Sequence, residues 1–171
     1  MTPLTFRFKD DGAVPNNPAL PMLVYRAAID LTGVRAVEER IETVFAANGW
    51  GRDMWRNGIF PYVHYHSMTH ELLGIARGRG TVRFGGDNGE ELEVSAGDVA
   101  VLPAGTGHQR LSASADFLVI GAYPPGGKYD LCRGSRAEHD AALKTIAQVP
   151  LPDSDPLHGK DGPLTALWRP S

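Results

Sequence analysis

The most informative run of this sequence is Gly58-Ile-Phe-Pro-Tyr-Val-His64-Tyr-His66-Ser-Met-Thr-His70-Glu71, where three of the six histidines of the chain fall within seven residues. Side chains two residues apart on an extended strand point to the same side, so His64 and His66 can present two imidazoles on one face. Two such imidazoles chelate a transition metal, and neighbouring strands can add a carboxylate and another imidazole. The run therefore predicts a metal site with nitrogen and carboxylate ligands.

Glycines frame this run, and a second framed run follows it. The first run reads Gly58, five residues, His64-x-His66, four residues, Glu71, six residues and Gly78. The second run, 18 residues further on, reads Gly97, five residues, Pro103-x-Gly105, two residues and His108. Together the runs span about 50 of the 171 residues, and this joint spacing is more specific than a histidine cluster alone.

The two runs resemble the paired motifs of the cupin superfamily. The flanking sequence, with a Pro-Asn-Asn-Pro start, a helix before the first motif and a C-terminal Gly-Pro-Leu before a Trp, resembles the YjlB-like group of small bacterial cupins. The resemblance implies a double-stranded β-helix, which is a jelly-roll barrel with both motifs lining its inside. It also implies one divalent transition metal (iron, manganese, nickel or zinc) held by His64, His66, Glu71 and His108. The second motif usually ends in Asn four residues after its His; here Ser112 stands at that position, which is not a metal ligand in the family.

His70 competes with Glu71 for the fourth ligand position. The two residues are adjacent, so only one of them can face the barrel interior on a regular strand. The spacing to Gly78 favours Glu71, and His70 is then expected to face the other way in a structural role. An all-histidine site with Glu71 pointing outward is the alternative.

Two further residues are candidates for a catalytic role. Arg110 shares the strand face of His108, and an inward arginine beside a metal would hold a carboxylate or phosphate bidentately. The alternative places Arg110 in solvent at the barrel mouth. Tyr62 shares the face of His64 and His66, where it could donate a proton or simply form part of the core wall.

Short apolar runs separated by glycine turns fill the chain from Ile59 to Tyr123, which predicts a mainly β fold with a sandwich or small barrel. The expected strands cover 60–65, 71–76, 81–84, 90–94, 99–102, 108–111 and 117–123, and a further short strand is expected over 23–29. An amphipathic helix over 34–45 is expected before them, and a helix opened by a capping box at Ser135 is expected after them. Residues 163–168 predict one more strand or a packed arm.

One domain accounts for the length of the chain. The expected organisation is a single cupin domain over 1–171, with a core barrel at about 55–124, an N-terminal arm and helix over 1–54, and a C-terminal helix and tail over 125–171. The three tryptophans are expected to pack in the core or at an interface.

The composition excludes several classes of protein. With 17 Lys plus Arg against 20 Asp plus Glu, the net charge is −3 and no basic cluster predicts nucleic-acid binding. No apolar stretch approaches the ~18 residues of a membrane span. Cys132 is the single cysteine, so it forms no internal disulfide and suits a reducing compartment. The expectation is a cytoplasmic protein, and the cupin resemblance adds a homodimer.

The resemblance leaves the reaction open. Four ligands leave one or two metal positions for a substrate oxygen, O₂ or water. Dioxygenase-like chemistry and isomerase- or decarboxylase-like chemistry on a small anionic metabolite are both expected candidates. A metal- or ligand-binding module that senses without turnover is the alternative, and no attached regulatory domain supports it.

Overall fold

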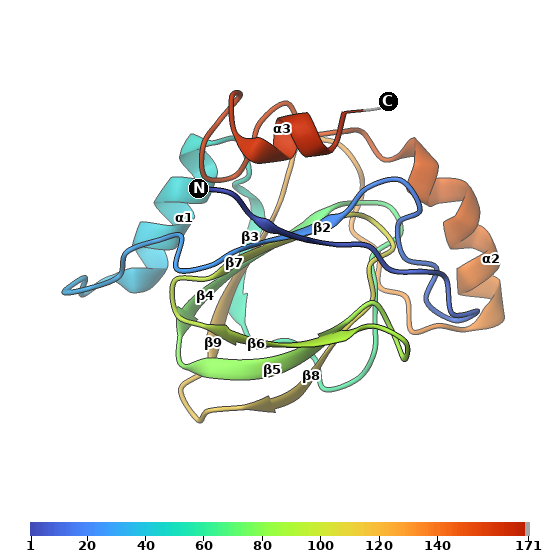
Figure 1. Cartoon of the computed structure of the whole chain (residues 1–171), viewed down its shortest axis with the longest axis horizontal. Helices are drawn as coiled ribbons and strands as arrows, with labels where there is room; N and C mark the ends of the chain where they lie inside the picture. The colour runs from blue at the N-terminus through green and yellow to red at the C-terminus, as the bar shows by residue number, and fades with distance from the viewer. Residues whose placement is uncertain (170–171) are drawn as a thin grey trace.

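Two antiparallel sheets face each other in the computed structural model, which describes residues 1–169 (Figure 1). The larger sheet has the order β1-β2-β7-β4-β9-β3, and the smaller has the order β6-β5-β8. The strands are β1 Leu4–Phe6, β2 Met22–Tyr25, β3 Arg52–Asn57, β4 Glu71–Arg77, β5 Arg79–Phe84, β6 Glu90–Ser95, β7 Val99–Leu102, β8 His108–Ala113 and β9 Leu118–Tyr123. The expected mainly β class is confirmed.

The strands differ from the expectation in three places. Residues 60–65 form no strand, because Pro61 lies within this segment and only isolated bridges pair His64 with His108 and Tyr65 with Cys132. The sheet gains β3 instead, whose polar sequence lacks the alternation that predicts a strand. β1 is a further strand that was not expected. It pairs with β2, which overlaps the strand expected over 23–29, and both extend the large sheet beyond the core of 55–124.

Alternating side chains of the large sheet divide between two hydrophobic clusters. On β4, Leu72 faces an outer cluster, whereas Leu73 and Ile75 face an inner cluster between the two sheets. The inner cluster takes Val82 and Phe84 from the small sheet as well. This parity fixes which residues of the central strands can reach the barrel interior.

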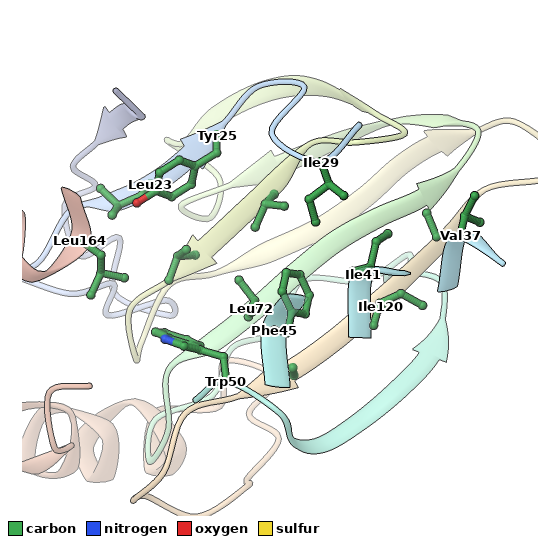
Figure 2. Close-up of a cluster of buried hydrophobic side chains, with 14 of the residues drawn as sticks. Leu23, Tyr25, Ile29, Val37, Ile41, Phe45, Trp50, Leu72, Ile120 and Leu164 are labelled. Carbon is green, nitrogen blue, oxygen red and sulfur yellow. The ribbon is translucent and has the colours of Figure 1, made fainter. Parts of the chain in front are cut away.

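Helices cover the outer face of the large sheet. Figure 2 shows α1 (Val37–Ala47) packing Ile41 and Phe45 against this face, where both side chains are fully buried. Gly74 on β4 permits the contact, because a Cβ there would lie 2.7 Å from Cζ of Phe45. The helix begins at Val37 and ends at Ala47, within about three residues of the expected range 34–45 at both ends.

The C-terminal region packs as two further helical units. α2 (Arg136–Thr145) begins with the expected capping box, in which Ser135 and Glu138 exchange side-chain-to-backbone hydrogen bonds. It continues into the 3₁₀ turn η1 (Ile146–Gln148). The tail forms α3 (Pro163–Leu167) rather than a strand, and it lies over the outer face of the large sheet (Figure 1) as a packed arm. Within residues 1–169, no helix is both long and apolar enough to cross a membrane.

Candidate metal centre

Glu71 is the first residue of β4, and its position in the strand directs its side chain into the barrel. It shares the parity of the inward residues Leu73 and Ile75. Its strand partner is Leu102, which also belongs to the inner cluster. Glu71 is therefore 3% exposed and carries a carboxylate into a largely apolar interior.

The three histidines come from two segments whose backbones form hydrogen bonds with each other. The His64 N–H donates to the His108 carbonyl at 3.1 Å, and the His108 N–H donates to the His64 carbonyl at 2.9 Å. His66 is held two residues further on, where its carbonyl accepts from the Gly105 N–H at 2.7 Å. One ring nitrogen from each of the three buried histidines lies within 4.8 Å of the others. The expected convergence of the two motifs is therefore present.

Each of the three imidazoles uses Nδ1 to bind a backbone carbonyl. The partners are Tyr62 for His64 at 3.0 Å, Asp130 for His66 at 2.5 Å and Thr106 for His108 at 3.1 Å. Because a carbonyl oxygen only accepts, each Nδ1 carries the proton. The neutral ring then keeps its lone pair on Nε2, the arrangement that orients metal-ligating histidines.

The Glu71 carboxylate completes a set of donors that needs a cation. Its Oε1 lies 3.2 Å from Nε2 of His66, and its Oε2 lies 3.1 Å from Nε2 of His108. Oε2 is buried and makes no hydrogen bond of suitable geometry. Imidazole lone pairs and a carboxylate repel one another unless a proton or a metal lies between them. The residues present therefore fit a divalent transition metal.

When no metal is bound, the pKa values indicate which of these side chains are charged. Burial and the neighbouring His108 lower the pKa of His64 to about 3. Burial also opposes the charged form of His66, but the Glu71 charge and hydrogen bond outweigh it and raise the pKa of His66 to about 9. The pKa of Glu71 lies well below its usual range despite full burial, because His66 and His108 favour the carboxylate. When no metal is bound, a proton on His66 therefore supplies the positive charge beside the Glu71 carboxylate.

His70 faces away from this centre, as expected. Its Nδ1 accepts from the Ala104 N–H at 2.9 Å, and its ring lies 4.8 Å from the ring of Trp168 in the outer layer. Its parity is that of Leu72, which belongs to the outer cluster. Glu71 rather than His70 is therefore the residue beside the three converging imidazoles.

The burial of His70 predicts a loss of stability in acid. Burial lowers its pKa from the usual 6.5 to about 4. The unfolded chain then binds more protons than the folded chain between these values, so the contribution is complete above pH 6.5 and disappears as the pH falls towards 4. It amounts to at most about 3 kcal/mol. Urea unfolding of the metal-free protein between pH 7 and 4 should therefore show a steeper loss than unfolding of His70→Asn, which retains an acceptor for the Ala104 N–H; equal slopes would contradict this account.

A cavity of about 480 Å³ opens beside the metal centre. It is lined by Asp53, Trp55, Arg56, Asn57, Gly58, Ile59, Phe60, His64, His66, Glu71, Leu73, His108, Tyr123 and Tyr129. The expected ligand residues thus share one space with several aromatic rings, and a small molecule placed there could reach the metal position.

Neither of the two catalytic candidates lines this cavity. Arg110 does share the inward face of His108, but its Nε donates to the Ile59 carbonyl at 3.0 Å and its side chain lines a separate pocket beyond Ile59 and Phe60. Tyr62 stacks on Phe60 with ring centroids 4.9 Å apart, and the Arg133 guanidinium lies 3.6 Å from the centroid of the Tyr62 ring. Strand parity alone was insufficient, because the segment before His64 separates Arg110 from the metal centre.

The structure brings in residues that the motifs do not contain. Tyr123, the last residue of β9, donates its hydroxyl to Oε1 of Glu71 at 3.4 Å and accepts from Nε1 of Trp55 at 3.0 Å. Tyr129 lies beside them, with its ring 5.2 Å from that of His66. Tyr123 has the same strand parity as Val119 of the inner cluster. This parity is the sequence signal that could have identified Tyr123 as an inward residue. Trp55 was expected only to pack, and it forms a cavity wall.

The comparisons with known proteins identify the family of this chain. A cupin domain match covers residues 54–120. The chain is also 44% identical over 164 residues to the uncharacterized protein YjlB of Bacillus subtilis (strain 168), which covers 96% of this chain and 95% of that protein. The chain therefore belongs to the cupin superfamily. Within it, the likeness along nearly the whole chain places it in the YjlB-like group.

Solved structures with a similar arrangement include proteins of lower identity. A crystal structure of DMSP lyases matches with a TM-score of 0.38 and 20% identity, over 48% of this chain and 41% of that chain, so this chain spans about two fifths of the lyase chain. Acireductone dioxygenase from Bacillus anthracis, with a cadmium ion in its active centre, matches with a TM-score of 0.38 and 16% identity, over 60% of this chain and 76% of that chain.

Proposed function

We propose that this cupin is an enzyme that binds one divalent transition metal through His64, His66, Glu71 and His108 and acts on a small molecule in the adjoining cavity. The observation that carries the proposal is the common orientation of the three imidazoles, whose Nδ1 atoms are all held by backbone carbonyls. The buried carboxylate oxygen without a hydrogen bond supports the same donor set. A solvent-exposed histidine cluster would need neither feature.

The chain's own residues would prepare the site in three ways. The backbone carbonyls fix the tautomer of each imidazole. Tyr123 holds Oε1 of Glu71 and limits rotation of the carboxylate. Apolar side chains beside the proposed metal position lower the local dielectric constant, which strengthens electrostatic interactions there. A metal bound there supplies Lewis-acid chemistry, and a redox-active metal adds chemistry with O₂.

Dioxygenase-like and isomerase- or decarboxylase-like reactions both remain within this proposal, and different measurements separate them. A dioxygenase consumes O₂ when it receives Fe(II) and substrate. An isomerase or decarboxylase works without O₂ and tolerates several divalent metals. A sensing module binds metal or ligand and converts nothing. The homodimer and the cytoplasmic location also stay predictions, and light scattering of the purified protein measures the first of these.

The experiment that tests the proposal is elemental analysis of protein purified without a histidine tag, followed by O₂-uptake and anaerobic turnover screens. We expect close to one transition-metal ion per chain and turnover of at least one small molecule in one of the screens. Protein that is purified metal-free and takes up no iron, manganese, nickel, cobalt or zinc would contradict the proposed metal centre. A metal-loaded protein that converts no compound in either screen would count against the enzyme.

A further inference from the structure

The cavity beside the metal centre offers no free cation among its described side chains. Among residues 1–169, Arg56 is the only lysine or arginine that lines it. Its guanidinium is bound by Glu42 at 2.7 and 2.9 Å and by Glu39 at 3.3 Å. Asp53 also lines the cavity, and its carboxylate lies 3.7 Å from the Arg52 guanidinium, on a side chain that is 74% exposed. An anionic group on a ligand would therefore find its positive partner only at the metal centre itself.

The walls of the cavity are mostly aromatic and apolar. Trp55, Phe60, Tyr123 and Tyr129 supply rings, and Leu73 adds an apolar side chain. The Tyr123 and Tyr129 rings meet edge to face, with centroids 5.9 Å apart. Such walls favour flat apolar groups, which gain both burial and ring contacts.

An irregularity in the pairing of β3 with β9 places Trp55 in the wall of the cavity. The pairing of β3 with β9 is irregular between Arg52 and Trp55, and Asp53 adopts a φ of +48°. After this irregularity the Trp55 indole lies directly over Gly121, where an added Cβ would come 1.9 Å from Cε2 of the indole. The indole N–H is already bound by the Tyr123 hydroxyl oxygen. Trp55 therefore turns an apolar ring surface, not a free donor, to the cavity.

From these features we infer that the cavity selects a ligand with a flat, apolar body and a single metal-binding head. This inference rests on the proposed metal centre and replaces the small anionic metabolite that Arg110 led us to expect. The head group reaches the three histidines and Glu71, and the body lies among Trp55 and the tyrosine rings. The volume of about 480 Å³ is within the range of pockets that enclose a whole small organic molecule.

Two probes with the same head group test this preference in the cobalt(II)-loaded protein. Benzohydroxamate and acetohydroxamate both bind metals through a hydroxamate, but only the first has a flat apolar body. Titration followed by the visible cobalt absorption should show that benzohydroxamate binds about tenfold or more tightly. Oxalate, a compact dianion, should bind more weakly than benzohydroxamate. Equal affinity of the two hydroxamates, or tighter binding of oxalate, would overturn the inference.

Variants of the wall residues test whether the aromatic walls cause the preference for benzohydroxamate. Trp55→Leu and the half-exposed Tyr129→Ala should each reduce the ratio of the two hydroxamate affinities by about threefold or more. Arg110→Gln is the matched control outside the cavity and should leave the ratio and the oxalate affinity unchanged. A lower oxalate affinity of the Arg110→Gln variant would mean that Arg110 helps to bind an anionic ligand, and it would contradict the inference. The comparison in the unmodified protein stays decisive if a wall variant fails to fold.

A metal-free measurement separates this inference from the metal centre. In the NMR spectrum of the apo protein, phenol should shift the indole N–H resonance of Trp55. The resonances of Trp50 and Trp168 should stay in place, because their N–H groups are bound to Ser154 and Pro21 carbonyls in the outer layer. If the protein binds no cobalt but shows this shift, the proposed function is refuted and the inference of an apolar cavity is kept. No selective shift of Trp55 refutes the apolar cavity, whether or not cobalt binds.

Discussion

His66→Ala will lose most of its bound metal, with an affinity reduced on the order of 100-fold or more. The estimate follows because loss of a mere hydrogen-bond partner of a metal ligand already costs about 10–100-fold. His66 is 5% exposed, and its Nε2 lies 3.2 Å from the Glu71 carboxylate. Metal also stabilises the folded chain by binding it preferentially, so the melting temperature of the variant should cease to rise when metal is added. Elemental analysis and thermal unfolding with and without metal measure both effects.

The matched control for this experiment lies four residues further along the chain. His70 is buried even more completely, at 1% exposure, but it faces the outer layer beside Trp168. His70→Asn should therefore keep the full metal content, although its stability falls. Metal content retained in His66→Ala, or lost equally in both variants, would mean that His66 is not a ligand.

Asp155→Ala will destabilise the fold by about 3–5 kcal/mol, because several donors lose one shared acceptor. The Asp155 side chain is completely buried and accepts from the Tyr25 hydroxyl and from the N–H groups of Leu157, His158 and Leu164. The Tyr25 bond joins the C-terminal tail to β2, and the three backbone bonds fold the tail upon itself. Tyr25 and Leu164 lie in the same cluster (Figure 2). Denaturant unfolding should show a midpoint reduced in proportion.

Tyr25→Phe provides the control for this prediction, since it removes a single donor and leaves the three backbone bonds of Asp155 in place. Its expected cost is about 1 kcal/mol. If Asp155→Ala were no more destabilising than Tyr25→Phe, the three backbone bonds that Asp155 accepts within the tail would contribute nothing to stability. The metal content of both variants should match that of the unmodified protein, because the tail lies on the outer face.

The four proposed ligands follow from the resemblance of the two glycine-framed motifs to those of the cupins, and strand parity supports part of this set. The choice of Glu71 over His70 is an example: adjacent residues of an extended chain face opposite sides, and the distance to Gly78 selected Glu71 as the inward one. The strand expected at 60–65 was wrong, yet His64 and His66 still converge because the backbone bridge to His108 holds this segment extended.

The walls of the cavity could not be predicted in the same way. Trp55 enters the cavity through an irregular pairing of β3 with β9 and through the space above Gly121, a contact between residues 66 positions apart. Arg110 has the right parity, but its side chain reaches the Ile59 carbonyl instead of the metal centre. Such contacts depend on how distant segments pack, and neither periodicity nor motif spacing describes that packing.

The most direct test is an anomalous difference map from crystals of the zinc- or cobalt-loaded protein. The account predicts one strong peak per chain, within about 2.3 Å of Nε2 of His64, His66 and His108 and of a Glu71 carboxylate oxygen. A peak elsewhere, such as between His139 and Asp10, which lie 2.8 Å apart on the surface, or no peak at the three histidines, would contradict it.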